Sequence, residues 1–158
     1  YLVPGFNGLG TPHWDPEARG SIHGLTRGSN RGHLARAALE SIAYQCDDVL
    51  RLIAEESGKK FTSVRSDGGG SSNNMLMQFQ ADISEVLIER SSSLETTSLG
   101  AAYLAGLGIG FWESQNQIER LWEPRGSFSP NMDPSHRALL RHYWLKAVER
   151  SLGWTARN

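Results

Sequence analysis

A run of three glycines between a predicted strand and a predicted helix constrains the fold of this chain more than any other feature. The run lies in residues 67–74, whose sequence is DGGGSSNN. Residues 61–66 before it have the pattern of a short strand, and residues 74–81 after it form an amphipathic helical pattern. Glycine has no side chain, so backbone amides in such a turn can approach a ligand, and the helix that starts behind them favours negative charge. The arrangement predicts a cradle for phosphate or ribose, with a nucleotide as the first candidate ligand.

The spacing of the glycines excludes two well-known nucleotide-binding loops. A P-loop requires G-x-x-x-x-G-K-[ST], and no lysine follows these glycines. A dinucleotide fingerprint requires G-x-G-x-x-G, and the third glycine is missing. Taken alone, the run is also compatible with an ordinary turn in which Asn73 only caps the following helix.

Composition and length describe an ordinary globular domain. With 158 residues, 39% of them apolar, the chain can form one domain with its own core, and a formal charge of -1 argues against a nucleic-acid partner. No apolar run approaches the roughly 18 residues of a membrane span, so we expect no membrane partner. Cys46 is the only cysteine, which excludes an internal disulfide framework and fits a cytoplasmic location. The chain starts at Tyr1 without the features of a signal peptide, and we expect it to be part of a longer protein.

Residues 1–29 are rich in glycine and proline and predict an irregular segment that leads into a short strand. His13 and Asp15 lie in this segment and could be considered as metal ligands. No second histidine or carboxylate recurs at ligand spacing, and Asp15 precedes a proline, which is a usual opening of a turn. We therefore predict a turn and no metal site.

A long helix is predicted over residues 30–57. Ser29 or Asn30 can cap its start, and Gly58 ends it. Apolar residues recur every three or four positions along one face: Leu34, Ala38, Ile42, Cys46, Val49 and Ile53. Charged residues occupy other positions, where we expect a solvated surface: Arg36, Glu40, Asp47, Asp48 and Arg51.

Further elements follow the glycine run. The predicted ranges are 86–89 for a strand, 96–108 and 114–121 for helices, 124–130 for a loop and 133–152 for a last helix. The helix at 96–108 is rich in small residues, which we expect to pack tightly against a sheet or another helix. Short strands that alternate with long helices predict an α/β layer fold with partly parallel strands.

Four stretches, in the family's order and spacing, resemble the C-terminal part of the FGGY family of carbohydrate kinases. They are GLGTPHWDPEARG at 8–20, GSIHGL with HLARAALE at 20–40, the glycine run with MQFQ at 67–80, and TSLGAAYLAG at 97–106. The first stretch favours members that phosphorylate glycerol over those that act on xylulose or gluconate. The resemblance implies that residues 1–152 form the nucleotide-binding part of the C-terminal domain and that residues 153–158 form a tail.

The resemblance implies an actin-like, ribonuclease-H-like ATPase fold in which two similar domains hold ATP between them. It implies that Gly68 and Gly69 lie against the ribose and the nearest phosphate. Asn73 would then be both a helix cap and a nucleotide contact, since its amide can donate and accept hydrogen bonds. Gly70 stands where the family often has alanine, so we do not count it among the ATP-binding residues.

The activity implied by the resemblance is ATP-dependent phosphorylation of glycerol to glycerol 3-phosphate. Mg²⁺ would be held mainly through the ATP phosphates and through residues upstream of Tyr1. The general base, the glycerol pocket and the loops around the outer phosphates are expected upstream as well, so we assign no catalytic residue and no metal ligand to this chain and expect it to be inactive alone. The first strands of its own domain would also lie upstream, so a chain truncated at its N-terminal side should expose apolar surface and a free sheet edge.

The implied partners are glycerol, a missing N-terminal domain, and further copies in a homodimer or homotetramer. Two alternatives stay open at this point. One is another sugar or polyol kinase of the same family, and the other is a non-catalytic interaction module that binds a nucleotide without transferring phosphate.

Overall fold

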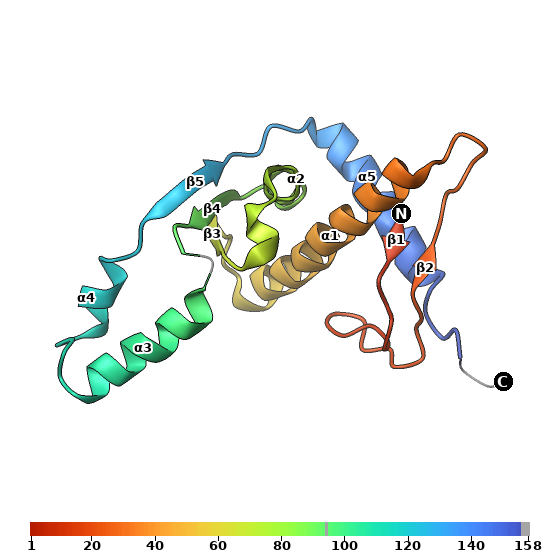
Figure 1. Cartoon of the computed structure of the whole chain (residues 1–158). Helices are drawn as coiled ribbons and strands as arrows, with labels where there is room; N and C mark the ends of the chain where they lie inside the picture. The colour runs from red at the N-terminus through yellow and green to blue at the C-terminus, as the bar shows by residue number, and fades with distance from the viewer. Residues whose placement is uncertain (94, 156–158) are drawn as a thin grey trace.

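A three-stranded sheet and the helix that connects two of its strands form the centre of the molecule (Figure 1). In the computed structural model, which describes residues 1–93 and 95–155, β3 (Ser63–Ser66) pairs in parallel with β4 (Leu87–Ser91). β4 pairs antiparallel with β5 (Pro124–Phe128). The connecting helix, α2 (Asn74–Ser84), packs on β4 and β5. This strand–helix–strand unit confirms the predicted α/β fold with partly parallel strands.

The long helix predicted over residues 30–57 is α1 (Arg31–Ser57), which packs along α2. Asn30 and His33 form a reciprocal capping box at its start. Gly58 ends the helix with a φ of 66°, a left-handed conformation that glycine adopts without strain. Both predicted boundaries are confirmed.

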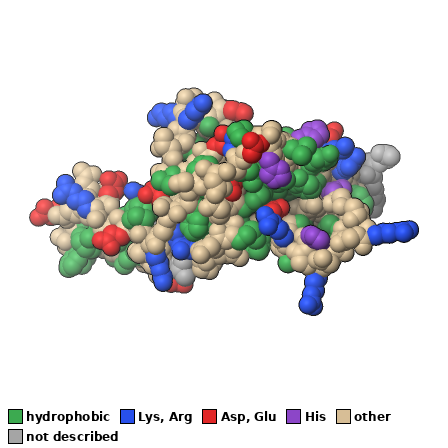
Figure 2. Space-filling view, turned by 90° about the horizontal axis from the view of Figure 1, so that it is seen from above, with side chains coloured by type: hydrophobic (Ala, Val, Ile, Leu, Met, Phe, Trp, Pro, Cys, Tyr) green, Lys and Arg blue, Asp and Glu red, His purple; other side chains and the backbone are tan. Residues whose placement is uncertain are grey.

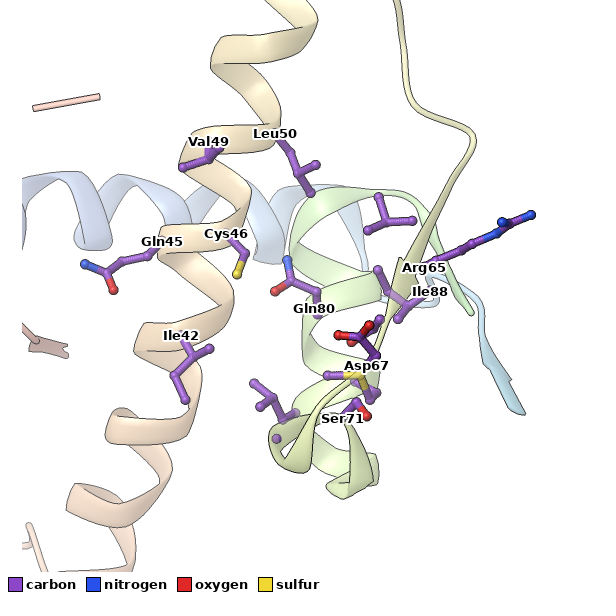
Figure 3. Close-up of a pocket in the computed structure, with 15 residues that line it drawn as sticks. Ile42, Gln45, Cys46, Val49, Leu50, Arg65, Asp67, Ser71, Gln80 and Ile88 are labelled. Carbon is purple, nitrogen blue, oxygen red and sulfur yellow. The ribbon is translucent and has the colours of Figure 1, made fainter. Parts of the chain in front are cut away.

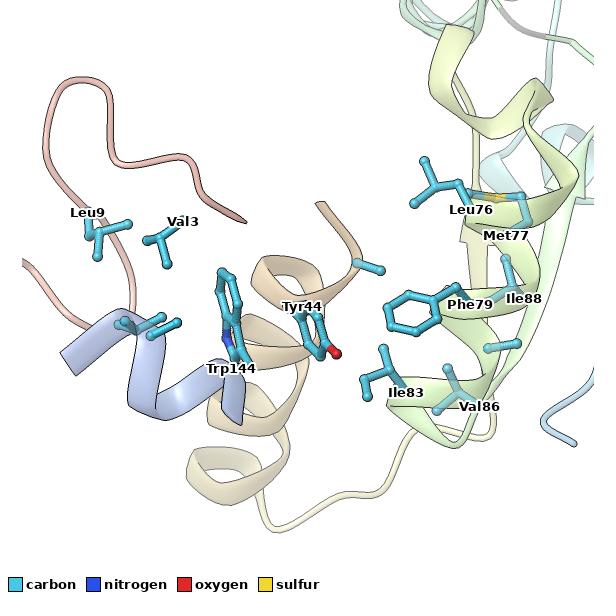
Figure 4. Packing of buried hydrophobic residues seen from close by; sticks show 14 of the residues in the cluster. Val3, Leu9, Tyr44, Leu76, Met77, Phe79, Ile83, Val86, Ile88 and Trp144 are labelled. Atoms are coloured by element: carbon cyan, nitrogen blue, oxygen red, sulfur yellow. The ribbon is translucent and has the colours of Figure 1, made fainter. Parts of the chain in front are cut away.

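Tyr44 of α1 lies at the centre of the core (Figure 4). Its ring stacks on Trp144 of α5 (Pro134–Glu149), with 4.9 Å between ring centroids and 7° between planes. Phe79 of α2 meets the same ring edge-on at 5.3 Å. The aromatic stack therefore joins α1, α2 and α5, and geometry of this kind stabilises more than the buried area alone.

The N-terminal segment packs beside α1 and α5 as a small two-stranded sheet. β1 (Leu2–Val3) and β2 (Ser21–Ile22) pair antiparallel, and β1 contacts both helices. Asp15 accepts hydrogen bonds from the amides of Glu17 (2.8 Å) and Ala18 (3.1 Å), so the predicted turn is present.

The remaining helices are α3 (Thr96–Gly108) and α4 (Gln115–Glu119), and α5 ends a few residues before the predicted position. The chain then turns back toward the N-terminal segment. The Gly153 amide donates to the Asp15 carboxylate at 2.7 Å. Residues 156–158 of the predicted tail lie outside the described residues.

The prediction of a loop over residues 124–130 is wrong, because most of this segment is strand β5. Pro124 is the first residue of that strand, a position where its missing N–H donor is tolerated. Gly126 pairs with Arg90 of β4. Pairing with β4, a strand distant in sequence, outweighed the local preference of Pro124 and Gly126 for a turn. Tertiary contacts often outweigh local strand propensity.

The solvated surface predicted for the charged residues of α1 is wrong at Asp47 and Asp48, which are both buried. Arg141 of α5 donates to both carboxylates. Arg36 and Glu40 do form the expected surface pair, at 2.6 Å. A buried charge is stable only with a partner. Arg141 of α5 supplies one to both aspartates, and Arg51 of α1 supplies a second to Asp47 at 2.8 Å.

The apolar face of α1 is largely exposed in this chain, at Leu34, Ile42 and Ile53. The edge of β3 opposite β4 also pairs with no strand among residues 1–93 and 95–155. These observations confirm the expected exposure of apolar surface and of a free sheet edge.

Tight packing of the small residues of α3 is not observed in the described part of the chain, where only Gly106 of this helix is buried. Gly106 lies against Trp112, and the helix extends away from the sheet with α4 (Figure 1). Hydrophobic side chains, shown in green, are visible at this end of the molecule in Figure 2. Ile109 is 84% exposed and Phe111 is 71% exposed. The prediction was wrong because no sheet or helix among residues 1–93 and 95–155 covers the small-residue face of α3.

Candidate functional site

The glycine run forms a tight turn between β3 and α2, as the sequence predicts. Gly68 has φ 77° and ψ 173°, a backbone conformation that is essentially restricted to glycine. A short 3₁₀ turn, η1 (Gly69–Ser72), follows it. Inside the turn, the Ser71 hydroxyl donates to the Gly68 carbonyl and the Ser72 hydroxyl donates to the Gly69 carbonyl, each at 2.7 Å. These bonds set the local shape of the turn.

One side of the turn is open. A Cβ atom built on Gly68 or Gly69 would have no neighbour within 4 Å, and Gly69 is exposed. The amides of Gly69 and Gly70 donate to no other residue of the described chain. Gly69 therefore combines an amide that has no partner among the described residues with open space on its Cβ side, which suits the approach of an acceptor group on a ligand.

Asn73 caps α2, which confirms its predicted structural role. Its Oδ1 accepts a hydrogen bond from the Leu76 amide at 3.1 Å. The side-chain NH₂ group has no hydrogen-bond partner within the described ranges. Cap and ligand contact can therefore coexist, with Oδ1 used in the cap and Nδ2 left to donate.

Two residues outside the glycine run connect it to neighbouring elements. Thr96, the first residue of α3, donates its hydroxyl to the carboxylate of Asp67. Arg90 of β4 donates to the Ser71 carbonyl. Sequence reasoning missed both residues. The sequence signal for Arg90 was its position directly after the predicted strand 86–89, because ligand sites in α/β sheets lie at the carboxyl ends of strands.

A groove of about 600 Å³ lies between α1 and the β3–α2 unit (Figure 3). Its walls are mainly apolar, and include Ile42, Cys46, Val49, Leu50, Met77 and Ile88. Asp67 and Ser71 of the glycine turn border it. A second groove of about 330 Å³ is lined by Asp67, Thr96, Tyr103 and Trp122. Gly68, Gly69 and Asn73 line neither groove, but Asp67 borders both, so the turn lies where the two grooves meet.

A separate polar cluster lies between α1 and α5. Burial raises the pKa of the Asp48 carboxyl above its usual range, while a hydrogen bond from Trp144 and the nearby His13 oppose that rise. His13 Nε2 is 3.8 Å from Asp48 Oδ2. Among the described residues no group of three or more His, Cys, Asp or Glu side chains is arranged to hold a metal ion. The cluster joins the two helices and lies apart from the glycine turn.

Across residues 1–93 and 95–155, no helix combines the length and the apolar character needed to cross a membrane.

Known proteins are similar to this chain in sequence and in fold. The sequence model of the FGGY family of carbohydrate kinases, C-terminal domain, matches residues 1–109. A glycerol kinase of Trichlorobacter lovleyi is 53% identical over 154 residues, which are 98% of this chain and 31% of that protein. The chain therefore spans about a third of the length of this curated relative.

Two solved structures extend the comparison. A glycerol kinase of Plasmodium falciparum, solved with ADP, superposes on 96% of this chain and 30% of its own, with a TM-score of 0.83 and 40% identity. A xylulose kinase of Lactobacillus acidophilus, solved with a bound ligand, superposes on 98% of this chain and 33% of its own, with a TM-score of 0.76 and 27% identity.

Proposed function

The chain belongs to the FGGY family of carbohydrate kinases, and on that premise we propose that it is the adenosine-binding part of an enzyme that phosphorylates glycerol with ATP. Its α/β fold is that of the C-terminal part of an actin-like, ribonuclease-H-like domain. The observation that carries the proposal is the 53% identity to a glycerol kinase along almost the whole chain. The solved glycerol kinase is also more similar in sequence, at 40%, than the solved xylulose kinase, at 27%.

The nucleotide would lie on the open side of the glycine turn. Gly68 and Gly69 would let the backbone approach the ribose and the nearest phosphate, and Nδ2 of Asn73 would donate to the adenosine. The geometry fits this role, because a Cβ at Gly69 would enter unfilled space that a ligand could occupy. Gly70 needs no such role, since a Cβ there would make only an ordinary contact with Leu76, at 3.9 Å.

The chemistry at the other end of ATP would come from the rest of the complete protein. Phosphoryl transfer depends on positioning and charge stabilisation around an in-line attack, with Mg²⁺ bridging phosphate oxygens. We propose that Mg²⁺ is held mainly through those oxygens and by residues outside this chain. The contribution of residues 1–158 is then to bind and orient the adenosine end of the nucleotide.

An adjoining N-terminal domain would cover the surface that this chain leaves open. The apolar groove beside β3, the free edge of that strand and the exposed end of α3 support this arrangement, because a folded protein rarely leaves such surfaces exposed. We propose residues 1–152 as the nucleotide-binding part, a tail at 153–158, a cytoplasmic location, and a homodimer or homotetramer as the assembly.

The decisive experiment is an assay of ATP-dependent phosphorylation with the complete protein, offered glycerol, xylulose and gluconate in parallel. The proposal requires that glycerol be the preferred acceptor and that glycerol 3-phosphate form. Residues 1–158 alone should bind no acceptor and form no measurable product. Preference for another acceptor would indicate a different sugar or polyol kinase, and nucleotide binding without any phosphoryl transfer would indicate an interaction module.

A further inference from the structure

Arg90, near the end of β4, connects the glycine turn to the start of α2. Its Nη1 donates to the Ser71 carbonyl at 3.2 Å and to Oδ1 of Asn74 at 2.8 Å. Ser71 belongs to η1, and Asn74 is the first residue of α2. One guanidinium nitrogen therefore contacts both the turn that carries Gly69 and the helix start beside Asn73.

The guanidinium is itself confined by β5. Its Cζ lies 5.4 Å from the centroid of the Phe128 ring. Gly126 is its partner across the β4–β5 ladder, and a Cβ at Gly126 would lie 3.4 Å from Nη2 of Arg90. Glycine at that position leaves space for the guanidinium. Arg90 thus links the sheet to the turn, and its planar group is packed on one side against the aromatic ring.

The hydrogen bonds inside the turn cannot replace this link. The hydroxyls of Ser71 and Ser72 donate to carbonyls inside the turn, so they set its shape but not its position relative to the sheet. The two bonds from Arg90 are charge-assisted, and such bonds are stronger than those between neutral groups. The position of the turn on the sheet therefore depends on Arg90 more than on the serines.

We propose that Arg90 is a positioning residue for nucleotide binding, which holds the Gly69 amide and the Asn73 side chain in one geometry. The inference rests on the proposed function, in which those two groups contact the adenosine end of ATP. Arg90 acts through Ser71 and Asn74 and does not itself bind the nucleotide. Its loss leaves the donors present but poorly placed, so it weakens ATP binding and leaves the acceptor site unchanged.

The test compares Arg90→Met, Arg90→Lys and Arg125→Met in the complete protein. Arg125 lines the same small hollow of about 210 Å³, is exposed, and has no hydrogen bond to any residue in the described ranges, so its loss removes the same charge without releasing the turn. In Arg90→Met we expect the KM for ATP to rise about tenfold, which corresponds to about 1.4 kcal/mol of binding free energy. The kcat and the KM for glycerol should change by less than about twofold, because the acceptor site is untouched. Arg90→Lys should recover part of the ATP affinity, and Arg125→Met should resemble the wild type.

Several outcomes would overturn the inference. An unchanged KM for ATP in Arg90→Met would do so, and so would an equal rise in Arg125→Met, since that would indicate a general charge effect. If Arg90→Met is recovered only unfolded, Arg90→Lys carries the test and must raise the KM for ATP more than that for glycerol. Adding Asn74→Ala to Arg90→Met should raise the KM for ATP no further, because the contact is already lost, and a further independent rise would contradict action through Asn74.

Failure of this inference can be told apart from failure of the proposed function by measuring ATP binding directly with calorimetry. A wild-type protein that binds ATP but phosphorylates no glycerol, with weaker ATP binding in Arg90→Met, would refute the function and support the positioning role. If the wild-type protein phosphorylates glycerol and Arg90→Met binds ATP with unchanged affinity, the proposed function would be supported and the positioning role refuted. A wild-type protein that binds no ATP would overturn both.

Discussion

Trp144 donates its indole Nε1 proton to Oδ2 of Asp48 at 2.7 Å, although the two residues are 96 positions apart. The same indole ring stacks on Tyr44, so a single side chain of α5 makes both a polar and an aromatic contact with α1. Burial of a carboxylate is costly unless it is paired and hydrogen-bonded. The contact between α1 and α5 therefore depends on a complete set of polar partners, which Trp144 and Arg141 supply together.

Arg141→Met should be strongly destabilising, because it leaves the buried Asp48 without its arginine and the buried Asp47 with only Arg51, which is on the same helix. Removing one partner of a buried ion pair costs about 3–5 kcal/mol. The matched control is Arg36→Met, which breaks the surface pair with Glu40 and should cost less than about 1 kcal/mol. Chemical denaturation of both variants measures the two free energies of unfolding, and similar values would show that the buried cluster has no special role.

Asn73→Ala and Asn73→Ser separate the two roles of this side chain. Both variants lose the amide that we propose contacts the adenosine, so both should raise the KM for ATP about tenfold, as expected for one lost hydrogen bond of about 1.4 kcal/mol. Serine is a good helix cap, so only the alanine variant should also lower the free energy of unfolding, by about 1 kcal/mol. Steady-state kinetics and denaturation provide both readouts. Wild-type ATP affinity in Asn73→Ser would mean that Asn73 is only a cap, and an equal change in the KM for glycerol would count against the adenosine assignment.

Gly69→Val should weaken ATP binding more severely than Asn73→Ala. The new Cβ meets no protein atom within 4 Å, so the chain can accommodate it, but it would occupy the path by which the nucleotide approaches the backbone. Gly70→Ala is the control, since its Cβ makes only an ordinary contact with Leu76 and Gly70 is not among the proposed ATP-binding residues. Calorimetric titration with ATP is the measurement, with circular dichroism to verify folding. A folded Gly69→Val protein with wild-type affinity for ATP would rule out the proposed nucleotide site.

Stability should fall as the pH is lowered through the range in which His23 titrates. Burial, followed by the nearby Arg150, holds the pKa of His23 below its ordinary value of 6.5. The unfolded chain therefore takes up a proton at a higher pH than the folded protein does. The stability linked to His23 is fully present above pH 6.5 and is lost as the pH falls toward the lower, folded-state pKa.

His23→Gln removes this titration while keeping a hydrogen-bonding group near Ser21, which lies 2.9 Å from the His23 ring. Melting temperatures measured between about pH 7.5 and 5.5 should therefore decline less steeply in the variant than in the wild type. Identical slopes would show that other groups cause the pH dependence.

Much of the candidate site could be predicted from local sequence, but its supports could not. The glycine run predicted the turn, and the position of Asn73 predicted a cap, because both depend on interactions within a few residues. Arg90 was missed as a site residue, since its contacts with Ser71 and Asn74 arise only when β4 lies beside β3. The proposed nucleotide contacts of Gly68, Gly69 and Asn73 stay predictions.

Local sequence patterns were sufficient to predict α1, the β3–turn–α2 unit and both bounds of α3. Helix periodicity, caps and glycine conformation act over one or two turns, and sequence alone contains that information. Tertiary structure decided the rest. It made residues 124–128 a strand by pairing them with β4, and it buried Asp47 and Asp48 by bringing Arg141 to them from α5. A charge can lie in water or in a core, and which of these occurs depends on a partner that only the folded chain brings near.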